Sequence, residues 1–128
     1  MTPRSFPIIY TGDVGSSLAF YRELGFDPYY HHPDSDDPNY VGLRRGDSDI
    51  GIVARSSPKE LLDVEMGTQP RFELFIYVDS VDTQIERLRQ SGVPVIREPE
   101  DMPWGDRLGY VTDPDGNPVV LAVSGSDR

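Results

Sequence analysis

The hydrophobic pattern of the chain falls into two similar blocks, each of which predicts a strand, one helix and three further strands. In the first block, an apolar run at 6–11 predicts a strand, and an apolar stripe at helical spacing follows it. Asp13 offers an N-cap for this helix, and Gly25 offers its C-terminal stop. The three further strands are expected at 26–32, 40–45 and 50–54.

The second block repeats this order after a stretch without clear periodicity at 55–70. A strand is expected at 71–78, before a helix that either Asp79 or Ser80 caps and that Gly92 ends. This helix carries its own apolar stripe, so it is expected to lie on one face of its sheet.

A β-hairpin is expected to close the chain. A short strand at 93–96 and a loop at 97–105 lead into it. Its strands, at 107–112 and 119–123, flank the turn Asp113-Pro114-Asp115-Gly116-Asn117. Proline presets φ near the start of such a turn and glycine tolerates a positive φ near its end, so this segment is interpreted as structural.

The two blocks match at an offset of 67 residues, which places Tyr10 on Tyr77 and Gly25 on Gly92. Helix periodicity alone could produce such a match, but the shared strand, helix stop and hairpin favour a duplicated unit. We therefore expect one α+β domain over 1–128, built from two tandem β-α-β-β-β modules. The modules are expected at 5–54 and 71–124, with a linker at 55–70. Together they are expected to form a curved mixed sheet with a concave cavity, with both helices on its outer face.

Charge and composition narrow the class of partner. The chain has 22 acidic and 12 basic residues, for a net charge of -10. This charge argues against nucleic acid and anionic membranes and favours a cationic ligand, although a solvated acidic surface is the simpler explanation. The sequence contains no cysteine, which excludes disulfides and thiolate chemistry. It has neither a membrane-length apolar run nor the apolar core of a signal peptide, which favours a cytoplasmic protein.

Two segments carry a family resemblance. One runs from Gly12-Asp13-Val14 to Leu24-Gly25-Phe26, and the other from Pro103-Trp104-Gly105 to the turn at 113–117. Together they resemble the vicinal-oxygen-chelate superfamily of glyoxalase I, extradiol dioxygenases and bleomycin-resistance proteins, over essentially the whole chain. The resemblance is specific for the fold, whereas many chemistries share this scaffold.

The resemblance also indicates which positions would hold a metal ion. Enzymes of this family hold a divalent metal inside the concave sheet, with ligands from the first and last strands of each half. Carried over by position, those ligands fall at Phe6, Gly51, Glu73 and Val120. Only Glu73 can ligate a metal, which falls short of the roughly three protein ligands of a catalytic site. The resemblance therefore implies a relative without a metal or other cofactor.

The chain has only two histidines, His31 and His32. Because neighbouring residues of a strand point to opposite faces, at most one of them faces the cavity. We expect a surface pair beside an acidic loop. A metal site rebuilt from one histidine, Glu73 and another carboxylate is the alternative.

Side-chain alternation predicts what lines the concave face. If Phe6 and Glu73 face the cavity, every second residue after them does so too, and Leu74, Ile76 and Val78 pack under the helices. The candidate ligand-binding residues are Ile8, Tyr10, Tyr40, Glu73, Phe75, Tyr77, Trp104, Arg107 and Tyr110. Such a surface suits a flat aromatic ligand with a cationic or amide group for the carboxylate. An aromatic core buried at a dimer interface is the alternative.

The bleomycin-resistance branch is the most similar part of the family. Its members are metal-free, acidic dimers that sequester a cationic aromatic antibiotic, and their corner tryptophan lines the drug groove. The resemblance therefore implies a homodimer that binds a small molecule, without catalysis, and gives Trp104 a stacking role.

Two enzymatic alternatives stay open. One is a glyoxalase-type lyase or dioxygenase with unusual metal ligands. The other is a metal-independent isomerase that uses Glu73 as a base, since a carboxylate enclosed by aromatic rings has a raised pKa unless it is paired. Pairing of Glu73 with the ligand, or with an arginine such as Arg107 or Arg44, is favoured over catalysis because no second acid–base group is identifiable nearby.

Overall fold

The computed structural model describes residues 5–34, 36, 38–56, 67–70 and 72–125. The chain divides into two compact units, Met1–Thr68 and Gln69–Arg128. The boundary between the units lies within the stretch at 55–70 that was predicted as a linker.

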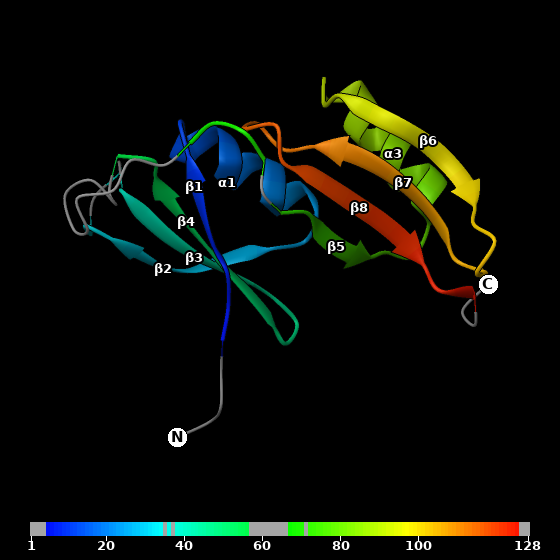
Figure 1. The fold of residues 1–128 in the computed structure, drawn as a ribbon. Helices are drawn as coiled ribbons and strands as arrows, with labels where there is room; N and C mark the ends of the chain where they lie inside the picture. The colour runs from blue at the N-terminus through cyan, green and yellow to red at the C-terminus, as the bar shows by residue number, and fades with distance from the viewer. Residues whose placement is uncertain (1–4, 35, 37, 57–66, 71, 126–128) are drawn as a thin grey trace. The chain divides into compact units, whose positions relative to one another are not determined.

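The first unit is a four-stranded mixed sheet with one helix against it (Figure 1). Its strands run in the order β1-β4-β3-β2, with β1 parallel to β4 and the other neighbours antiparallel. Its elements are β1 (Ile8–Thr11), α1 (Val14–Glu23), β2 (Asp27–His32), β3 (Tyr40–Arg45) and β4 (Ser48–Ala54).

The second unit repeats this arrangement, with the strand order β5-β8-β7-β6 and helix α3 lying across one face of its sheet. Its elements are β5 (Leu74–Tyr77), α3 (Val81–Gln90), β6 (Val95–Asp101), β7 (Arg107–Thr112) and β8 (Pro118–Val123). Both units therefore follow one β-α-β-β-β order, which confirms the predicted α+β fold and its two tandem modules.

Each helix buries an apolar stripe against its own sheet. In the first unit the register row Ile9, Ile52 and Val41 is at most 2% exposed. In the second unit the buried side chains of α3 are Val81, Ile85 and Leu88. Removing such side chains from water is the main term that holds each helix on its sheet.

Both helices begin at a capping side chain, as the sequence predicted. Asp13 caps α1, with its carboxylate accepting a hydrogen bond from the Ser16 backbone N–H at 3.1 Å. Of the two candidates for α3, Ser80 is the cap, and its hydroxyl accepts from the Thr83 N–H at 3.2 Å. These bonds satisfy backbone donors that have no partner within the helix.

The turn at 113–117 is also as predicted. Asp113 is only 3% exposed, and its carboxylate accepts three hydrogen bonds of 2.9–3.0 Å from Asp115 N, Asn117 N and Asn117 Nδ2. Gly116 has a φ of 85°, in the region that glycine tolerates best. The segment is thus a structural turn built around a buried carboxylate.

Strand β6 corrects one prediction. A strand at 93–96 followed by a loop at 97–105 was expected, whereas β6 runs from Val95 to Asp101 and passes through Pro99. Its pairing with β7 shifts register twice, between Val95 and Arg97 and between Arg97 and Glu100. Proline is tolerated here because β6 lies at the edge of its sheet, where a missing backbone donor breaks no inner ladder.

Among the described residues, no helix is long and apolar enough to cross a membrane.

Candidate functional site

The second sheet has two apolar faces, and α3 covers only one of them. The row Ile76, Leu121 and Gly109 faces the helix, because a Cβ added at Gly109 would lie 3.2 Å from Ile85 Cδ1 of α3. Side chains alternate along a strand, so the neighbouring residues point the other way. Ile76 thus packs under the helix, as predicted.

The face away from α3 carries a second apolar cluster. Leu108, Val120 and Ala122 are at most 3% exposed, and the partly buried Met102 and Tyr110 pack against them. No helix of the described second unit lies over this cluster. Both faces of this sheet therefore carry buried apolar side chains, and α3 packs on only one of these faces.

Two aromatic side chains stand beside this cluster on β5. Phe75 pairs in register with Val120, and Tyr77 pairs with Ala122. Their rings are 5.3 Å apart between centroids, at 62°, and they remain 45% and 55% exposed. We call Phe75, Tyr77 and Tyr110, above Leu108, Val120 and Ala122, the second-sheet aromatic face.

Trp104 lies on the corner between β6 and β7 and is 67% exposed. Hydrogen bonds hold the corner: Met102 N donates to Asp106 O at 2.8 Å, and Gly105 N donates to Met102 O at 3.0 Å. Because Met102 packs on the apolar cluster, the corner is anchored next to the aromatic face while its indole stays in solvent. An exposed tryptophan on a fixed corner can stack on a ligand or a partner.

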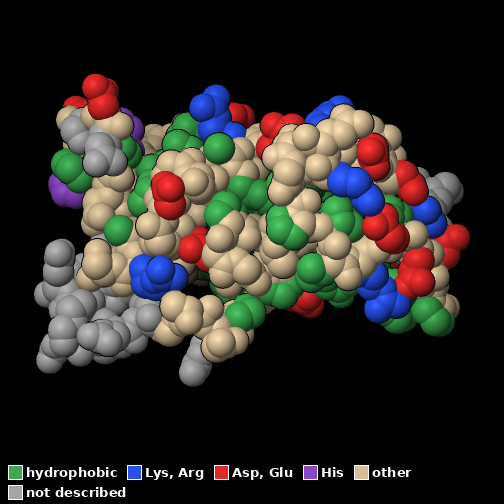
Figure 2. All heavy atoms as spheres, turned by 90° about the horizontal axis from the view of Figure 1, so that it is seen from above, with side chains coloured by type: hydrophobic (Ala, Val, Ile, Leu, Met, Phe, Trp, Pro, Cys, Tyr) green, Lys and Arg blue, Asp and Glu red, His purple; other side chains and the backbone are tan. Residues whose placement is uncertain are grey.

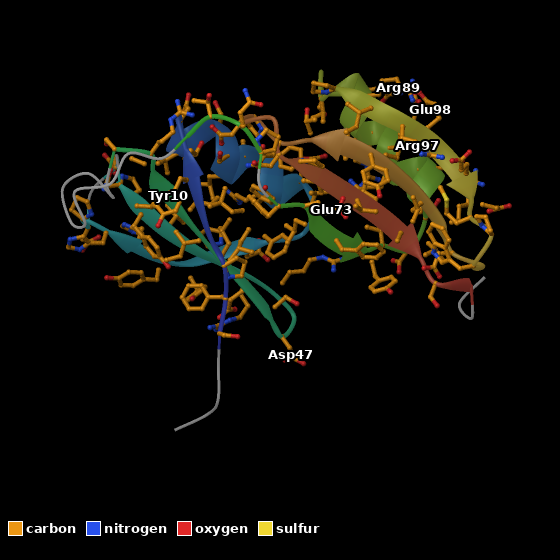
Figure 3. All side chains as sticks on the ribbon, in the orientation of Figure 1. Tyr10, Asp47, Glu73, Arg89, Arg97 and Glu98 are labelled. Carbon is orange, nitrogen blue, oxygen red and sulfur yellow. The ribbon has the colours of Figure 1, made fainter. Side chains whose placement is uncertain are left out.

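Glu73 is exposed and lies one residue before β5 begins (Figure 3). If the alternation of β5 extends to it, Glu73 lies on the side of Phe75 and Tyr77, which stays a prediction. Aromatic rings do not enclose it within its unit, and Arg107 and Arg44 are engaged elsewhere, by Asp82 and Asp49.

The structure corrects the predicted place of Arg107 beside Tyr110. Its guanidinium donates to both carboxylate oxygens of Asp82, on α3, at 2.8 Å and to Asp101 at 3.2 Å. Arg107 and Tyr110 are three residues apart on one strand, an odd spacing that points them to opposite faces. The hydrogen bonds from Arg107 lower the pKa of Asp82, and those to Asp82 and Asp101 raise the pKa of Arg107.

The first sheet also has a face turned away from its helix, and tyrosines line it. Ile8 is 44% exposed, and Tyr10 and Tyr40 lie in one register row with Val53 between them. The ring of Tyr30 lies 6.0 Å from that of Tyr40. The structure therefore brings the three predicted residues of this module to one face.

Tyr29 and Tyr30 are members of this face that the sequence interpretation missed. A register shift between Pro28 and Tyr30 inserts one extra residue into β2, so both rings reach the side of Gly42 and Tyr40. Simple alternation would send two adjacent tyrosines to opposite faces. The only signal in the sequence was the proline at position 28, which is typical of an irregular or edge strand. We call Tyr10, Tyr29, Tyr30 and Tyr40 the first-sheet tyrosine face.

The positions that family resemblance assigns to a metal do not fit one. Val120 is fully buried, and Phe6 and Gly51 offer no side-chain donor. The ring of Tyr40 fills the space beside Gly51, because a Cβ there would lie 2.7 Å from the Tyr40 hydroxyl. Across the described part of the chain, no group of three or more His, Cys, Asp or Glu could hold a metal ion.

The two histidines are exposed at the edge strand β2. His31 Nδ1 lies 3.3 Å from Pro33 O, and its Nε2 lies 3.8 Å from Asp34. These are local contacts at a surface.

The outer side of the second unit is polar. Acidic and basic side chains alternate over it (Figure 2), and Arg89 of α3 meets Glu98 of β6 (Figure 3). An open depression of about 470 Å³ on this side is lined by Asp82, Thr83, Glu86, Arg87 and Gln90. It lies on α3 and so is separate from the aromatic face of the same sheet.

Comparison with known proteins gives one family match over most of the chain. A family model described as the Glyoxalase/Bleomycin resistance protein/Dioxygenase superfamily matches residues 6–121. A bleomycin resistance protein from Klebsiella pneumoniae is 29% identical over 131 residues, covering 94% of this chain and 92% of that protein.

Solved structures agree in fold. A glyoxalase-related enzyme from Fulvimarina pelagi has a TM-score of 0.79 and 24% identity, covering 95% of this chain and 88% of that one. The bleomycin resistance determinant encoded on transposon Tn5 has a TM-score of 0.66 and 21% identity, covering 96% and 98%. At these identities the similarity concerns the fold alone.

Proposed function

Because this chain belongs to the Glyoxalase/Bleomycin resistance protein/Dioxygenase superfamily, and because one relative is named a bleomycin resistance protein, we propose that it binds and sequesters a small molecule. The ligand proposed is a cationic aromatic compound of the bleomycin type, bound without a metal. The observation that carries the proposal is the second-sheet aromatic face, which pairs a buried apolar floor with half-exposed rings.

The chemistry of this face suits a flat ligand. Stacking or edge contacts with Phe75 and Tyr77 each contribute about 0.5–1.5 kcal/mol beyond burial of area. Trp104, on its fixed corner, offers a further ring, and Glu73 is predicted on the same side of β5. A carboxylate near aromatic rings favours a cationic group, and the net charge of -10 favours its approach.

The residues at the family's metal-ligand positions support ligand binding rather than metal chemistry. Three of the four positions that the family resemblance assigns to metal ligands carry Phe6, Gly51 and Val120. These residues contribute apolar surface or bare backbone instead. Elemental analysis of the purified protein tests this point. Hemithioacetal turnover that appears on adding Ni²⁺ or Zn²⁺ would contradict it.

The direct test is a titration with bleomycin, read through the fluorescence of Trp104, the only tryptophan. We expect saturable quenching at micromolar drug. Tyr77→Ala should weaken binding about tenfold, the equivalent of one good stacking contact. Ile96→Ala is the matched control, since Ile96 and Tyr77 are both 55% exposed and Ile96 lies on the edge strand β6. A flat titration rejects bleomycin as the ligand.

Glu73→Gln separates binding from catalysis. For a sequestering protein, this change should weaken a cationic ligand and leave a neutral analogue unaffected, since only the charge is removed. If Glu73 were the base of an isomerase, the variant would instead keep its affinity and lose turnover.

A further inference from the structure

The chain just beyond β8 lies against the corner between β6 and β7 (Figure 1). In the ladder between β7 and β8, Arg107 pairs with Val123. The same antiparallel register, continued for two residues, places Gly125 opposite Gly105. The two glycines are in very close contact, because a Cβ added at Gly125 would lie 2.7 Å from the carbonyl oxygen of Gly105 and 2.9 Å from its carbonyl carbon. Backbone therefore packs directly on backbone, one residue after Trp104.

This contact, rather than backbone conformation, requires glycine at position 125. Gly105 has a φ of 104°, in the region that favours glycine, whereas Gly125 is not among the glycines with a positive φ. A side chain at position 125 would meet backbone atoms, which cannot rotate aside as the end of a flexible side chain can. A larger residue there would push the peptide group of Gly105 out of its place.

A hydrogen bond reinforces the contact. Gly125 N donates to Asp106 Oδ1 at 3.1 Å, so two consecutive residues of the corner, Gly105 and Asp106, meet Gly125. The corner is closed by its own bonds, in which Met102 N donates to Asp106 O and Gly105 N donates to Met102 O. Because Trp104 lies between Met102 and Gly105, a displacement of Gly105 is passed on to Trp104.

The base of the corner is held separately from its tip. Asp101 and Arg107 pair in register at the ends of β6 and β7, and the Arg107 guanidinium donates to Asp101 at 3.2 Å and to Asp82 of α3 at 2.8 Å. These contacts fix the base of the corner to its own sheet and helix. The indole of Trp104, at the tip, is 67% exposed and gains little from its own packing, so the backbone beneath it sets its direction.

We propose that Gly125 is a positioning residue for Trp104. Its contacts with Gly105 and Asp106 hold the corner, so that the indole is presented to the ligand in one direction. This role rests on the proposed function, in which Trp104 stacks on the ligand. Holding a ring in place before binding reduces the conformational entropy that is lost on binding, which raises affinity without an added contact. Gly125 acts through Trp104 and need not touch the ligand itself.

NMR spectra of the ligand-free, full-length ¹⁵N-labelled protein test the positioning directly. Trp104 is the only tryptophan, so its indole N–H gives a single resonance. In Gly125→Ala we expect this resonance to shift and its heteronuclear NOE to fall, because the corner is displaced and moves more freely. Gly67→Ala is the matched control, since nothing lies within 4 Å of a Cβ added there. An indole resonance that is unchanged in both respects in Gly125→Ala overturns the proposal.

Two substitutions of Asp106 test the hydrogen bond. Asp106→Ala and Asp106→Asn both remove the charge, but only asparagine keeps an oxygen that can accept from Gly125 N. Asp106→Ala should change the indole resonance of Trp104 as Gly125→Ala does, and Asp106→Asn should resemble the parent protein. Equal results for the two Asp106 variants overturn the proposal. If Gly125→Ala does not fold, this pair of variants decides alone.

Titration with bleomycin connects the corner with binding. Gly125→Ala should weaken binding about tenfold, which corresponds to the loss of the contact that one ring makes. The urea concentration at the midpoint of unfolding should stay close to that of the parent, because the contact lies beyond the last pair of the ladder. A lower midpoint with unchanged affinity would show a merely structural role and would overturn the proposal.

The outcomes also separate this inference from the proposed function. If the parent protein does not bind bleomycin, the proposed function fails for that drug. The indole resonance of the ligand-free variants then still decides whether Gly125 positions Trp104. If the parent binds bleomycin and Gly125→Ala binds it equally well, the proposed function stands and Gly125 has no positioning role.

Discussion

At the scale of single residues, the direction of each side chain decides what a sheet face offers. Tyr110 and Arg107 share β7, yet Tyr110 joins the apolar cluster while Arg107 pairs with Asp82 of α3. Between them, Gly109 lets Ile85 of α3 approach the sheet backbone. Each of these roles follows from a period of two along the strand, fixed by neighbours on adjacent elements.

Gly109→Ala tests the close contact between α3 and β7. The added Cβ would lie 3.2 Å from Ile85 Cδ1 and 3.3 Å from Arg97 O, which is tighter than ordinary packing. We expect the free energy of unfolding to fall by about 1–3 kcal/mol, as for other overpacked sites. Urea denaturation measures the change. Gly67→Ala, at an open position, should leave it nearly unchanged, and an equal loss in both variants would contradict the contact.

The ion pair between Asp82 and Arg107 predicts that the stability of the fold depends on pH. The hydrogen bond from Arg107 lowers the pKa of Asp82, so the folded state binds a proton there less readily than the unfolded chain. The stabilisation is therefore fully present above the unfolded value of about 3.9 and is lost as pH falls below it. Between pH 5 and pH 2.5, the urea concentration at the midpoint of unfolding should therefore fall less in the Asp82→Asn variant than in the parent protein. Asp47→Asn, at the tip of the β3–β4 hairpin (Figure 3), is the control. Parallel curves for all three proteins would refute the role of this pair.

At the scale of elements, caps and edges fix where helices and strands start and stop. Asp13 and Ser80 begin the two helices at equivalent places in the repeat. The edge strands β2 and β6 are irregular, each with a register shift and a proline. Such irregular edges discourage pairing with strands of other molecules. The inner strands of both sheets pair without a shift.

Ser80→Ala should destabilise α3. The change removes the hydroxyl that accepts from Thr83 N–H, at a typical cost of about 1 kcal/mol for a lost N-cap. Thermal unfolding followed by circular dichroism measures the effect. Ser80→Asp, which keeps a capping oxygen, should restore most of the stability. If Ser80→Asp folds but is no more stable than Ser80→Ala, the cap contributes little to the stability of α3.

At the scale of the whole molecule, a 14.4 kDa chain presents large apolar side chains on the faces that its helices leave uncovered. Several large apolar side chains in or beside the two sheets are 39–55% exposed. They include Ile8, Tyr29, Tyr30, Phe72, Phe75 and Tyr77. Monomeric proteins rarely leave such patches open unless a ligand or another chain uses them. The two modules thus share one fold but differ in the sheet face that lies away from the helix. This face is rich in tyrosine in the first module, whereas in the second it combines aromatic rings with an apolar cluster.

We expect the chain to form a homodimer. Association would remove part of this apolar surface from water, at about 25 cal/mol for each Å². Sedimentation velocity should give twice the mass of 14.4 kDa at micromolar concentration. A species of 14.4 kDa at every concentration would contradict the dimer and leave the exposed faces to the ligand alone.

The sheet face on which several candidate residues lie could be predicted from the sequence. Alternation from Phe6 and Glu73 correctly placed Ile8, Tyr10, Phe75 and Tyr77 on faces away from the helices. Arg107 was misplaced although its strand was predicted with the observed bounds, because it was grouped with Tyr110 despite the odd spacing that sends the two side chains to opposite faces. Tyr29 was missed because the bulge in β2 breaks the period of two.

The sequence by itself determined the local elements: the two modules, their helix caps and the turn around Asp113 depend on spacings of a few residues and on the φ preferences of proline and glycine. Only the tertiary structure decided which residues meet across strands. Register and bulges bring Gly42 opposite Gly51, put the ring of Tyr40 over that pair and send Arg107 to Asp82. These contacts join residues distant in sequence, so their geometry arises from packing of whole sheets and helices rather than from local spacing.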